Sequence, residues 1–186
     1  MTAPELDALT IVEVPAGHRG AYQDLLRLAD DSETAIAGYR DQGQLFGLLE
    51  PDGDQPRGHV LAIPNGEPET IELMSIAVAP AQQGRGLGRR LLLAVLERLA
   101  KQGWRRVVVA TATSSLGAIA FYQRLGFRML RIERDAFSPA TGYPADLHEH
   151  GIPVRDRVWL DHELGIPGEG TGSISGDLSQ SPCVSD

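Results

Sequence analysis

Three glycines, Gly84, Gly86 and Gly88, alternate with other residues where an apolar run over 70–78 gives way to an amphipathic segment over 87–102. Glycine allows tight backbone curvature and lets main-chain N–H groups approach a ligand closely. The first turn of the following helix would add unpaired N–H groups and the positive end of the helix dipole. The sequence therefore predicts an anion site suited to a phosphate or pyrophosphate.

The spacing of the turn distinguishes three kinds of phosphate-binding loop. A P-loop needs Lys directly after its last glycine, but Arg89 follows Gly88. A dinucleotide fingerprint needs a longer interval before its third glycine. The remaining match is Q-x-x-G-x-G, beginning at Gln83 after a strand that ends in Val-Ala-Pro. This pattern resembles the acetyl-CoA pyrophosphate loop of the GNAT superfamily of N-acetyltransferases.

A second motif lies downstream, over residues 113–127. It resembles the superfamily's other signature, in which a cap residue precedes a short helix that ends in A-x-x-[FL]-Y-x-x-x-G-F. The resemblance covers roughly residues 10–164. It implies an α/β fold with a mixed, mostly antiparallel sheet, flanking helices and a splayed pair of parallel central strands, here 72–78 and 106–111. Acetyl-CoA would bind between those two strands as the acyl donor.

The chemistry implied is attack of an amine on a thioester. An alkyl amine has a pKa of about 10.4 in water, so a base must remove a proton at neutral pH. By resemblance to histone acetyltransferases of the superfamily, Glu72, 11 residues before Gln83, is the candidate base. The resemblance also makes Tyr122 the candidate acid that protonates the departing CoA thiolate. Each has a structural alternative: a solvated strand residue for Glu72, and a packed helix residue for Tyr122.

The resemblance also implies a set of donor-binding residues: Ile76, Ala77, Val78, Gln83, Gly84, Arg85, Gly86, Leu87, Gly88, Arg89, Ser115, Ala118 and Tyr122. Main-chain N–H groups near Ala77 and Val78 would hold the tetrahedral oxyanion, and Arg90 would join Arg85 and Arg89 near the pyrophosphate. Two positions depart from family patterns. Ala110 stands where ribosomal-protein N-terminal acetyltransferases carry a Glu, which weakens that activity as the prediction. Ser115 stands where many members have Asn, and its hydroxyl can still form a hydrogen bond.

Hydrophobic periodicity and turn residues predict an alternation of strands and helices. The predicted strands are 10–14, 44–50, 57–63, 70–78, 106–111, 127–132 and 155–160, and the predicted helices are 20–29, 32–40, 87–102 and 115–125. We expect a single domain over 1–166. The Gly-, Ser- and Pro-rich segment 167–186 is expected to be disordered, because it has too few apolar residues to offset its ordering entropy.

Composition and charge limit the classes of molecule that the protein is expected to bind. The chain has 186 residues, a formal net charge of −8 and one cysteine, Cys183. The negative charge argues against a nucleic-acid surface and favours neutral or cationic acceptors. A lone cysteine excludes an intramolecular disulfide framework. With no leader-like start and no apolar run near 18 residues, we expect a cytoplasmic protein without a membrane span.

The segment 133–156 is a long irregular stretch of the kind that forms lids or binding loops. Its acids Asp135, Asp146, Glu149 and Asp156, with Asp30, Asp31 and Glu33, would line either an acidic mouth for a cationic amine or a solvated surface. His148 and His150 have no third ligand nearby in the sequence, so no metal site is expected.

The sequence therefore predicts an N-acetyltransferase that moves an acetyl group from acetyl-CoA to a primary amine, either a small amine or a protein Lys or N-terminus, in a ternary complex. The alternative is a non-catalytic sensor that binds CoA or acyl-CoA with the same fold. The acceptor, the acyl length and the choice between monomer and homodimer stay open.

Overall fold

The computed structural model describes residues 9–50, 53 and 55–165. Its strands are β1 (Thr10–Val14), β2 (Gln44–Leu49), β3 (Gly58–Pro64), β4 (Thr70–Val78), β5 (Arg106–Ala112), β6 (Arg128–Glu133), β7 (His148–Glu149), β8 (Ile152–Pro153) and β9 (Arg157–Glu163). Its α-helices are α2 (Gln23–Ala29), α3 (Glu33–Tyr39), α4 (Leu87–Lys101) and α5 (Leu116–Arg124), and short 3-10 helices cover Ala16–Tyr22, Pro80–Gln82 and Pro139–Thr141.

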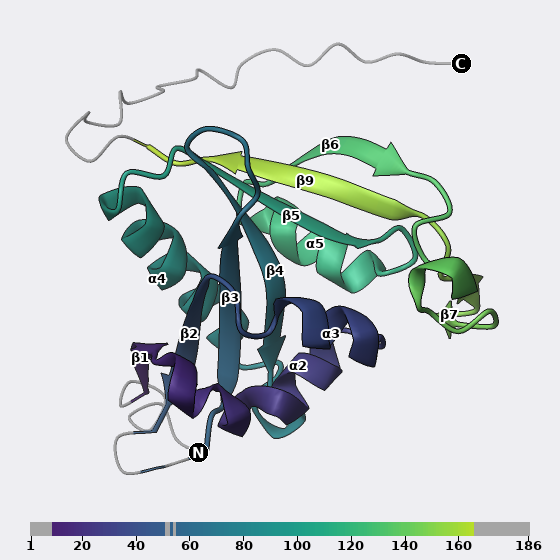
Figure 1. The fold of residues 1–186 in the computed structure, drawn as a ribbon. Coiled ribbons are helices and arrows are strands. Elements are labelled where there is room, and N and C mark those ends of the chain that lie inside the picture. Colours follow the sequence, from purple (N-terminus) through teal and green to yellow (C-terminus); the bar gives the residue numbers. More distant parts are fainter. Residues whose placement is uncertain (1–8, 51–52, 54, 166–186) are drawn as a thin grey trace, which may run out of the picture.

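Seven strands form one sheet in the order β1-β2-β3-β4-β5-β9-β6, and β7 and β8 form a separate small hairpin. Every neighbouring pair in the large sheet is antiparallel except β4 and β5, which run parallel. Figure 1 shows β4 and β5 diverging, so that β1–β4 and β5-β9-β6 form two arms. The predicted mixed, mostly antiparallel sheet with a parallel central pair is thereby confirmed.

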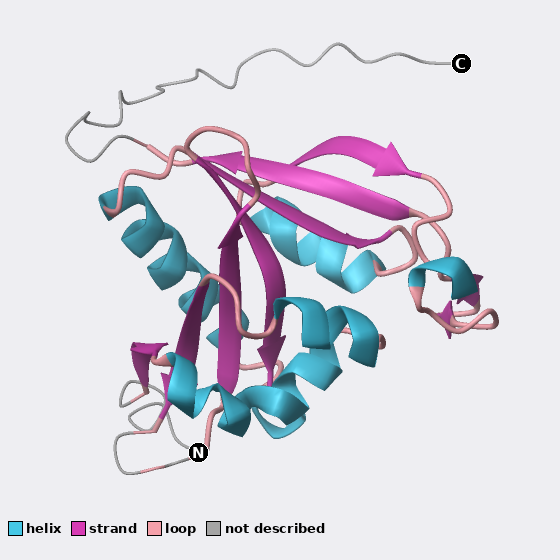
Figure 2. Ribbon diagram, in the orientation of Figure 1, coloured by secondary structure: helices cyan, strands magenta, loops and turns pink. Residues whose placement is uncertain are grey.

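The helices cover both faces of the sheet (Figure 2). On one face, α4 and α5 pack against the strands through their apolar stripes, which include Leu91, Leu92 and Val95 of α4 and Tyr122 of α5. On the other face, α2 and α3 cover the β1–β4 arm, in a cluster that includes Leu26 and Ile36. The stripe of α4 follows the i, i+3, i+4 spacing of its leucines, which is why this helix was the clearest in the sequence.

The predicted elements correspond closely to those observed, with ends that shift by at most three residues, as for the predicted strand 155–160 and the observed β9, and with two larger differences. The predicted helix 20–29 begins as the 3-10 turn Ala16–Tyr22 and becomes α-helical only at Gln23. The segment 133–156 contains a 3-10 turn and the β7–β8 hairpin, which the sequence pattern did not indicate. Among the described residues, no helix is long and apolar enough to cross a membrane. The predicted tail, 167–186, lies outside the described residues.

Candidate functional site

The site is built around the place where β4 and β5 separate. Register between them extends only from Thr70–Arg106 to Leu73–Val109, although β4 continues to Val78 and β5 to Ala112. β5 stays paired with β9 over its full length. On its other side, β4 carries a bulge at Met74, because Leu73 and Ser75 face consecutive residues of β3. A bulge bends its strand and increases the local twist, which opens the sheet at this point.

A cavity of about 750 Å³, here called the turn cavity, occupies the opening on the side of the Gly-rich turn. Gly84 and Gly86 have φ values of 73° and 77°, which residues with a Cβ rarely adopt, and a Cβ at either would point into open space. Gly86 is the N-cap of the 15-residue helix α4, and no side chain caps that end. The helix therefore presents free N–H groups to the turn cavity, as an anion site requires.

Nearly all the predicted donor-binding residues line the turn cavity. They are Ile76, Ala77, Val78, Gln83, Gly84, Gly86, Leu87, Gly88, Arg89, Ser115, Ala118 and Tyr122. Arg85 does not line it, because its guanidinium donates to Oε1 of the buried Gln82 at 3.1 Å. Arg90 donates instead to the Leu9 carbonyl at 3.0 Å. Arg124, which the sequence motifs did not indicate, also lines the turn cavity and is a second arginine there with Arg89.

The backbone of β4 supplies hydrogen-bond donors beyond the point of separation. The Ala79 N–H donates to the Arg57 carbonyl on the β3 side, whereas the Val78 carbonyl accepts from Gln83 Nε2 at 2.9 Å on the opposite side. Because successive residues of a strand alternate in the direction of their backbone groups, the N–H groups of Ile76 and Val78 point away from β3. Ala77, by the same alternation, faces β3.

Tyr122 lies on α5 and lines the turn cavity although its side chain is almost fully buried. Phe121 and Phe127 pack against its ring with centroids 5.3 and 5.5 Å away. Burial raises the pKa of the Tyr122 hydroxyl, because the phenolate would lose its hydration. The group therefore keeps its proton at neutral pH and can act as a hydrogen-bond donor or an acid.

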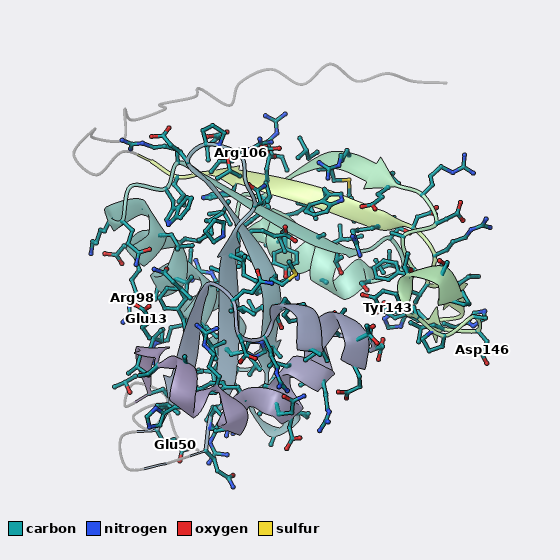
Figure 3. The ribbon with its side chains drawn as sticks, in the orientation of Figure 1. Glu13, Glu50, Arg98, Arg106, Tyr143 and Asp146 are labelled. Atoms are coloured by element: carbon teal, nitrogen blue, oxygen red, sulfur yellow. The ribbon has the colours of Figure 1, made fainter. Side chains whose placement is uncertain are left out.

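A second cavity of about 630 Å³, here called the loop cavity, lies between the α2–α3 connection and the loop over 133–156. Its acidic residues are Asp30, Asp31, Glu72 and Glu149; its aromatic residues are Tyr39, Phe137, Tyr143 and Trp159; and Arg157 is its one arginine. In Figure 3, Tyr143 lies on the side of the loop that faces α3, whereas Asp146 lies toward the outer end of the loop.

Glu72 is half-buried in the loop cavity and does not line the turn cavity. It sits in the part of β4 that is still paired with β5, opposite Val108. Burial raises the pKa of its carboxyl group, and the guanidinium groups of Arg157 and Arg131 partly oppose that shift.

Two tyrosines of the loop cavity, Tyr39 and Tyr143, lie close to the Asp30 carboxylate. The Tyr39 hydroxyl donates to Asp30 Oδ2 at 3.3 Å. Burial, with the Asp30 charge second, raises the pKa of Tyr39 and raises that of Tyr143 to about 12. Both hydroxyls therefore stay protonated beside the Asp30 carboxylate, and they give this end of the cavity donors as well as negative charge.

The acidic residues named in the sequence analysis divide into two groups. Asp30, Asp31 and Glu149 line the loop cavity, as an acidic mouth requires. The other four lie elsewhere. Asp146 is exposed, Glu33 pairs with Arg27 at 2.6 Å, Asp135 pairs with Arg155 at 2.5 Å, and Asp156 accepts from the Asp135 N–H. Within the described residues, no three His, Cys, Asp or Glu side chains gather closely enough to hold a metal ion.

Sequence reasoning missed the aromatic lining and Arg157. A signal for part of this was available in β9, where Val158 and Leu160 are buried while Arg157 and Trp159 alternate with them on the opposite face. That alternation places Arg157 and Trp159 together. The two side chains do lie close together, with the Arg157 guanidinium 5.9 Å from the centroid of the Trp159 ring. The same guanidinium lies 5.2 Å from the centroid of the Phe137 ring.

The two cavities share a wall at the point where β4 and β5 separate. Ala29, Leu73, Met74, Ala110, Thr111, Ser115 and Glu149 line both. Ser115 is the N-cap residue of α5, yet its hydroxyl does not cap the helix and donates instead to Glu149 Oε2 on β7. This hydrogen bond ties the 133–156 loop to the start of α5.

Comparison with known proteins agrees with this architecture. Residues 14–127 match the model of the Acetyltransferase (GNAT) family. The chain is 34% identical over 140 residues to the uncharacterized N-acetyltransferase YvbK of Bacillus subtilis, covering 74% of this chain and 87% of that protein.

Two solved structures are similar across most of the chain. An IAA acetyltransferase from Bacillus cereus has a TM-score of 0.75 at 35% identity and covers 84% of this chain and 99% of its own. A GNAT family acetyltransferase from Elizabethkingia anophelis with acetyl-CoA bound has a TM-score of 0.76 at 34% identity. The match covers 85% of this chain and 99% of that protein. The resemblance drawn from the two sequence motifs is thus confirmed: this chain belongs to the GNAT acetyltransferase family.

Proposed function

We propose that the protein transfers the acetyl group of acetyl-CoA to a primary amine by direct attack in a ternary complex. The observation that carries this proposal is the meeting of two differently lined cavities where β4 and β5 separate. The turn cavity offers a Gly-rich turn, a free helix N-terminus and two arginines to a pyrophosphate. The loop cavity offers carboxylates and aromatic rings to an amine.

In this proposal the reaction takes place at the shared wall. The amine nitrogen forms a bond to the acetyl carbon while the carbon–sulfur bond breaks. The N–H groups of Ile76 and Val78, which point away from β3, are the donors proposed for the developing oxyanion. Tyr122 donates its proton to the CoA sulfur, and a carboxylate receives the proton that the amine loses.

The acceptor proposed is a primary amine, on a small molecule or on a protein, that arrives in its cationic form. Asp30 and Asp31 line the loop cavity, and the Tyr39 hydroxyl donates a hydrogen bond to the Asp30 carboxylate. An ammonium group is attracted to both carboxylates and to the faces of the surrounding aromatic rings. Glu72 remains the sequence-based candidate for the base.

The test is calorimetric titration with acetyl-CoA, followed by measurement of thiol release with a panel of primary amines. Gly86→Glu places a carboxylate at the start of α4 and should abolish binding. Gly66→Glu is the matched control, since Gly66 also has a positive φ, 88°, and open space at its Cβ position, yet lies in the β3–β4 connection.

Both variants carry the same charge and the same kind of backbone strain, so a difference between them reports on the site. Loss of binding in the Gly86 variant alone supports the turn cavity as the donor site, and equal binding in both contradicts it. Binding without thiol release for any amine would favour the alternative of a CoA-binding sensor.

A further inference from the structure

The wall that the two cavities share contains a carboxylate. Of the seven described residues that line both cavities, five are apolar or threonine, one is Ser115 and one is Glu149. Glu149 is therefore the only ionisable side chain of this wall among the described residues. An amine in the loop cavity must cross this wall to reach a thioester in the turn cavity.

We infer that Glu149 is the general base of the transfer reaction, an assignment that rests on the proposed function. A base must lie within hydrogen-bond reach of the proton that it removes, and that proton is on the attacking nitrogen. Glu149 lines the place where this nitrogen must lie. Glu72 lines only the loop cavity, in the part of β4 that is still paired with β5.

The hydrogen bond from Ser115 gives Glu149 the fixed position that this role needs. The Ser115 hydroxyl donates to Oε2, while Oε1 lies 3.9 Å from His150 Nε2 and is not engaged by that hydroxyl. The side chain is partly exposed, with 39% of its surface accessible. One carboxylate oxygen is thus anchored to α5, and the other is left to accept a proton. Ser115 is a positioning residue in this scheme.

The proton inventory of the step is complete without a further reactant. The ammonium form of the amine gives one proton to the Glu149 carboxylate, and the neutral nitrogen attacks the thioester carbonyl. Collapse of the tetrahedral adduct expels the CoA sulfur, which takes the Tyr122 proton. The second proton of the nitrogen returns the tyrosinate to its hydroxyl form through solvent, and Glu149 releases its proton to water as product leaves.

The experiment compares Glu149→Gln with Glu72→Gln in steady-state acetyl transfer to benzylamine and to aniline. These probes carry an aromatic ring that suits the aromatic lining of the loop cavity. Benzylamine is protonated at neutral pH and aniline is not. Glutamine at position 149 keeps an oxygen that can accept from Ser115, so the loop stays tied while the basic group is lost.

We expect Glu149→Gln to lower kcat for benzylamine about 100-fold or more, with a smaller loss for aniline, because removing a general base costs most where a proton must be taken from the amine. Acetyl-CoA affinity measured by calorimetry should stay close to that of the parent. Glu149→Asp should recover part of the rate. Glu72→Gln should lower kcat for benzylamine by a smaller factor than Glu149→Gln does.

Two results would overturn the inference while the proposed function stands. In one, Glu149→Gln transfers acetyl groups to benzylamine at the parent rate. In the other, Glu149→Gln lowers kcat by the same factor for both amines, while Glu72→Gln lowers kcat more, and does so selectively for benzylamine. A parent protein that releases no thiol with any amine would instead defeat the proposed function, and the base assignment would fall with it.

Discussion

His59 makes the stability of this protein depend on pH in a way that can be calculated. Its ring is fully buried in β3, with Nε2 2.7 Å from Ser75 Oγ and with no hydrogen-bond partner for Nδ1 among the described residues. Burial lowers the pKa of His59 from 6.5 to about 3, because the imidazolium would lose its hydration. The folded protein therefore keeps this ring neutral across the mildly acidic range.

The unfolded chain binds a proton at this ring below pH 6.5 and the folded chain does not, so stability is lost as pH falls from 6.5 toward 3. The slope is about 1.4 kcal/mol per pH unit for one proton, which gives a loss of about 2 kcal/mol between about pH 8 and about pH 5. His59→Gln removes the titrating group and leaves an amide that can still reach Ser75.

The assay is urea unfolding of the parent and of His59→Gln at both pH values. The parent should lose about 2 kcal/mol more than the variant on acidification, whatever the variant costs at the higher pH. His150→Gln, the same change at an exposed ring, is the control for the substitution itself. Parallel losses in parent and His59→Gln would refute the reasoning. If the variant does not fold, an NMR titration in which the His59 ring protonates above pH 5 in the native parent would refute it equally.

Two further predictions concern Tyr122 and Glu72. Tyr122→Phe keeps the packing against Phe121 and Phe127 but removes the proposed acid, so kcat should fall about 100-fold with little change in thermal stability; transfer at the parent rate would remove the acid assignment. Because the pKa of Glu72 is raised in the folded state, the folded protein holds this proton more tightly than the unfolded chain does. The stability that the protonated Glu72 contributes is therefore lost as pH rises from 4.5 through the raised pKa of the folded state. Glu72→Gln should therefore stabilise the protein more at neutral pH than at pH 4, measured by urea unfolding, and an equal effect at both pH values would contradict this.

The fold was largely predictable because its signals are local. The leucine spacing of α4, the three consecutive valines of β5 and the turn residues between β2 and β3 each specify an element without reference to the rest of the chain. The turn cavity follows from the same kind of signal, since most of its lining comes from one continuous strand–turn–helix segment, 73–89.

The loop cavity was harder to predict because its walls come from separated parts of the chain, 29–39, 72–74, 110–115 and 137–159. Asp30, Glu72, Glu149 and Arg157 meet only after β9 has inserted between β5 and β6. No periodicity links residues that far apart, and irregular loops carry little pattern of their own. For this reason Glu149 stood in the sequence as one acidic loop residue among several, and its contact with Ser115 became visible only in three dimensions.

The position of β9 also constrains how the chain can assemble. β6 is synthesised before β9, yet its only strand partner in the described sheet is β9, and β5 likewise lacks a neighbour on one edge until β9 arrives. A nascent chain that has emerged only as far as residue 150 would therefore leave open the edges of β5 and β6 that β9 later covers. Met129, Leu130 and Ile132 of β6 are exposed even in the finished fold. Such edges invite pairing with other chains, so the second arm is open to aggregation during synthesis until β9 has been added.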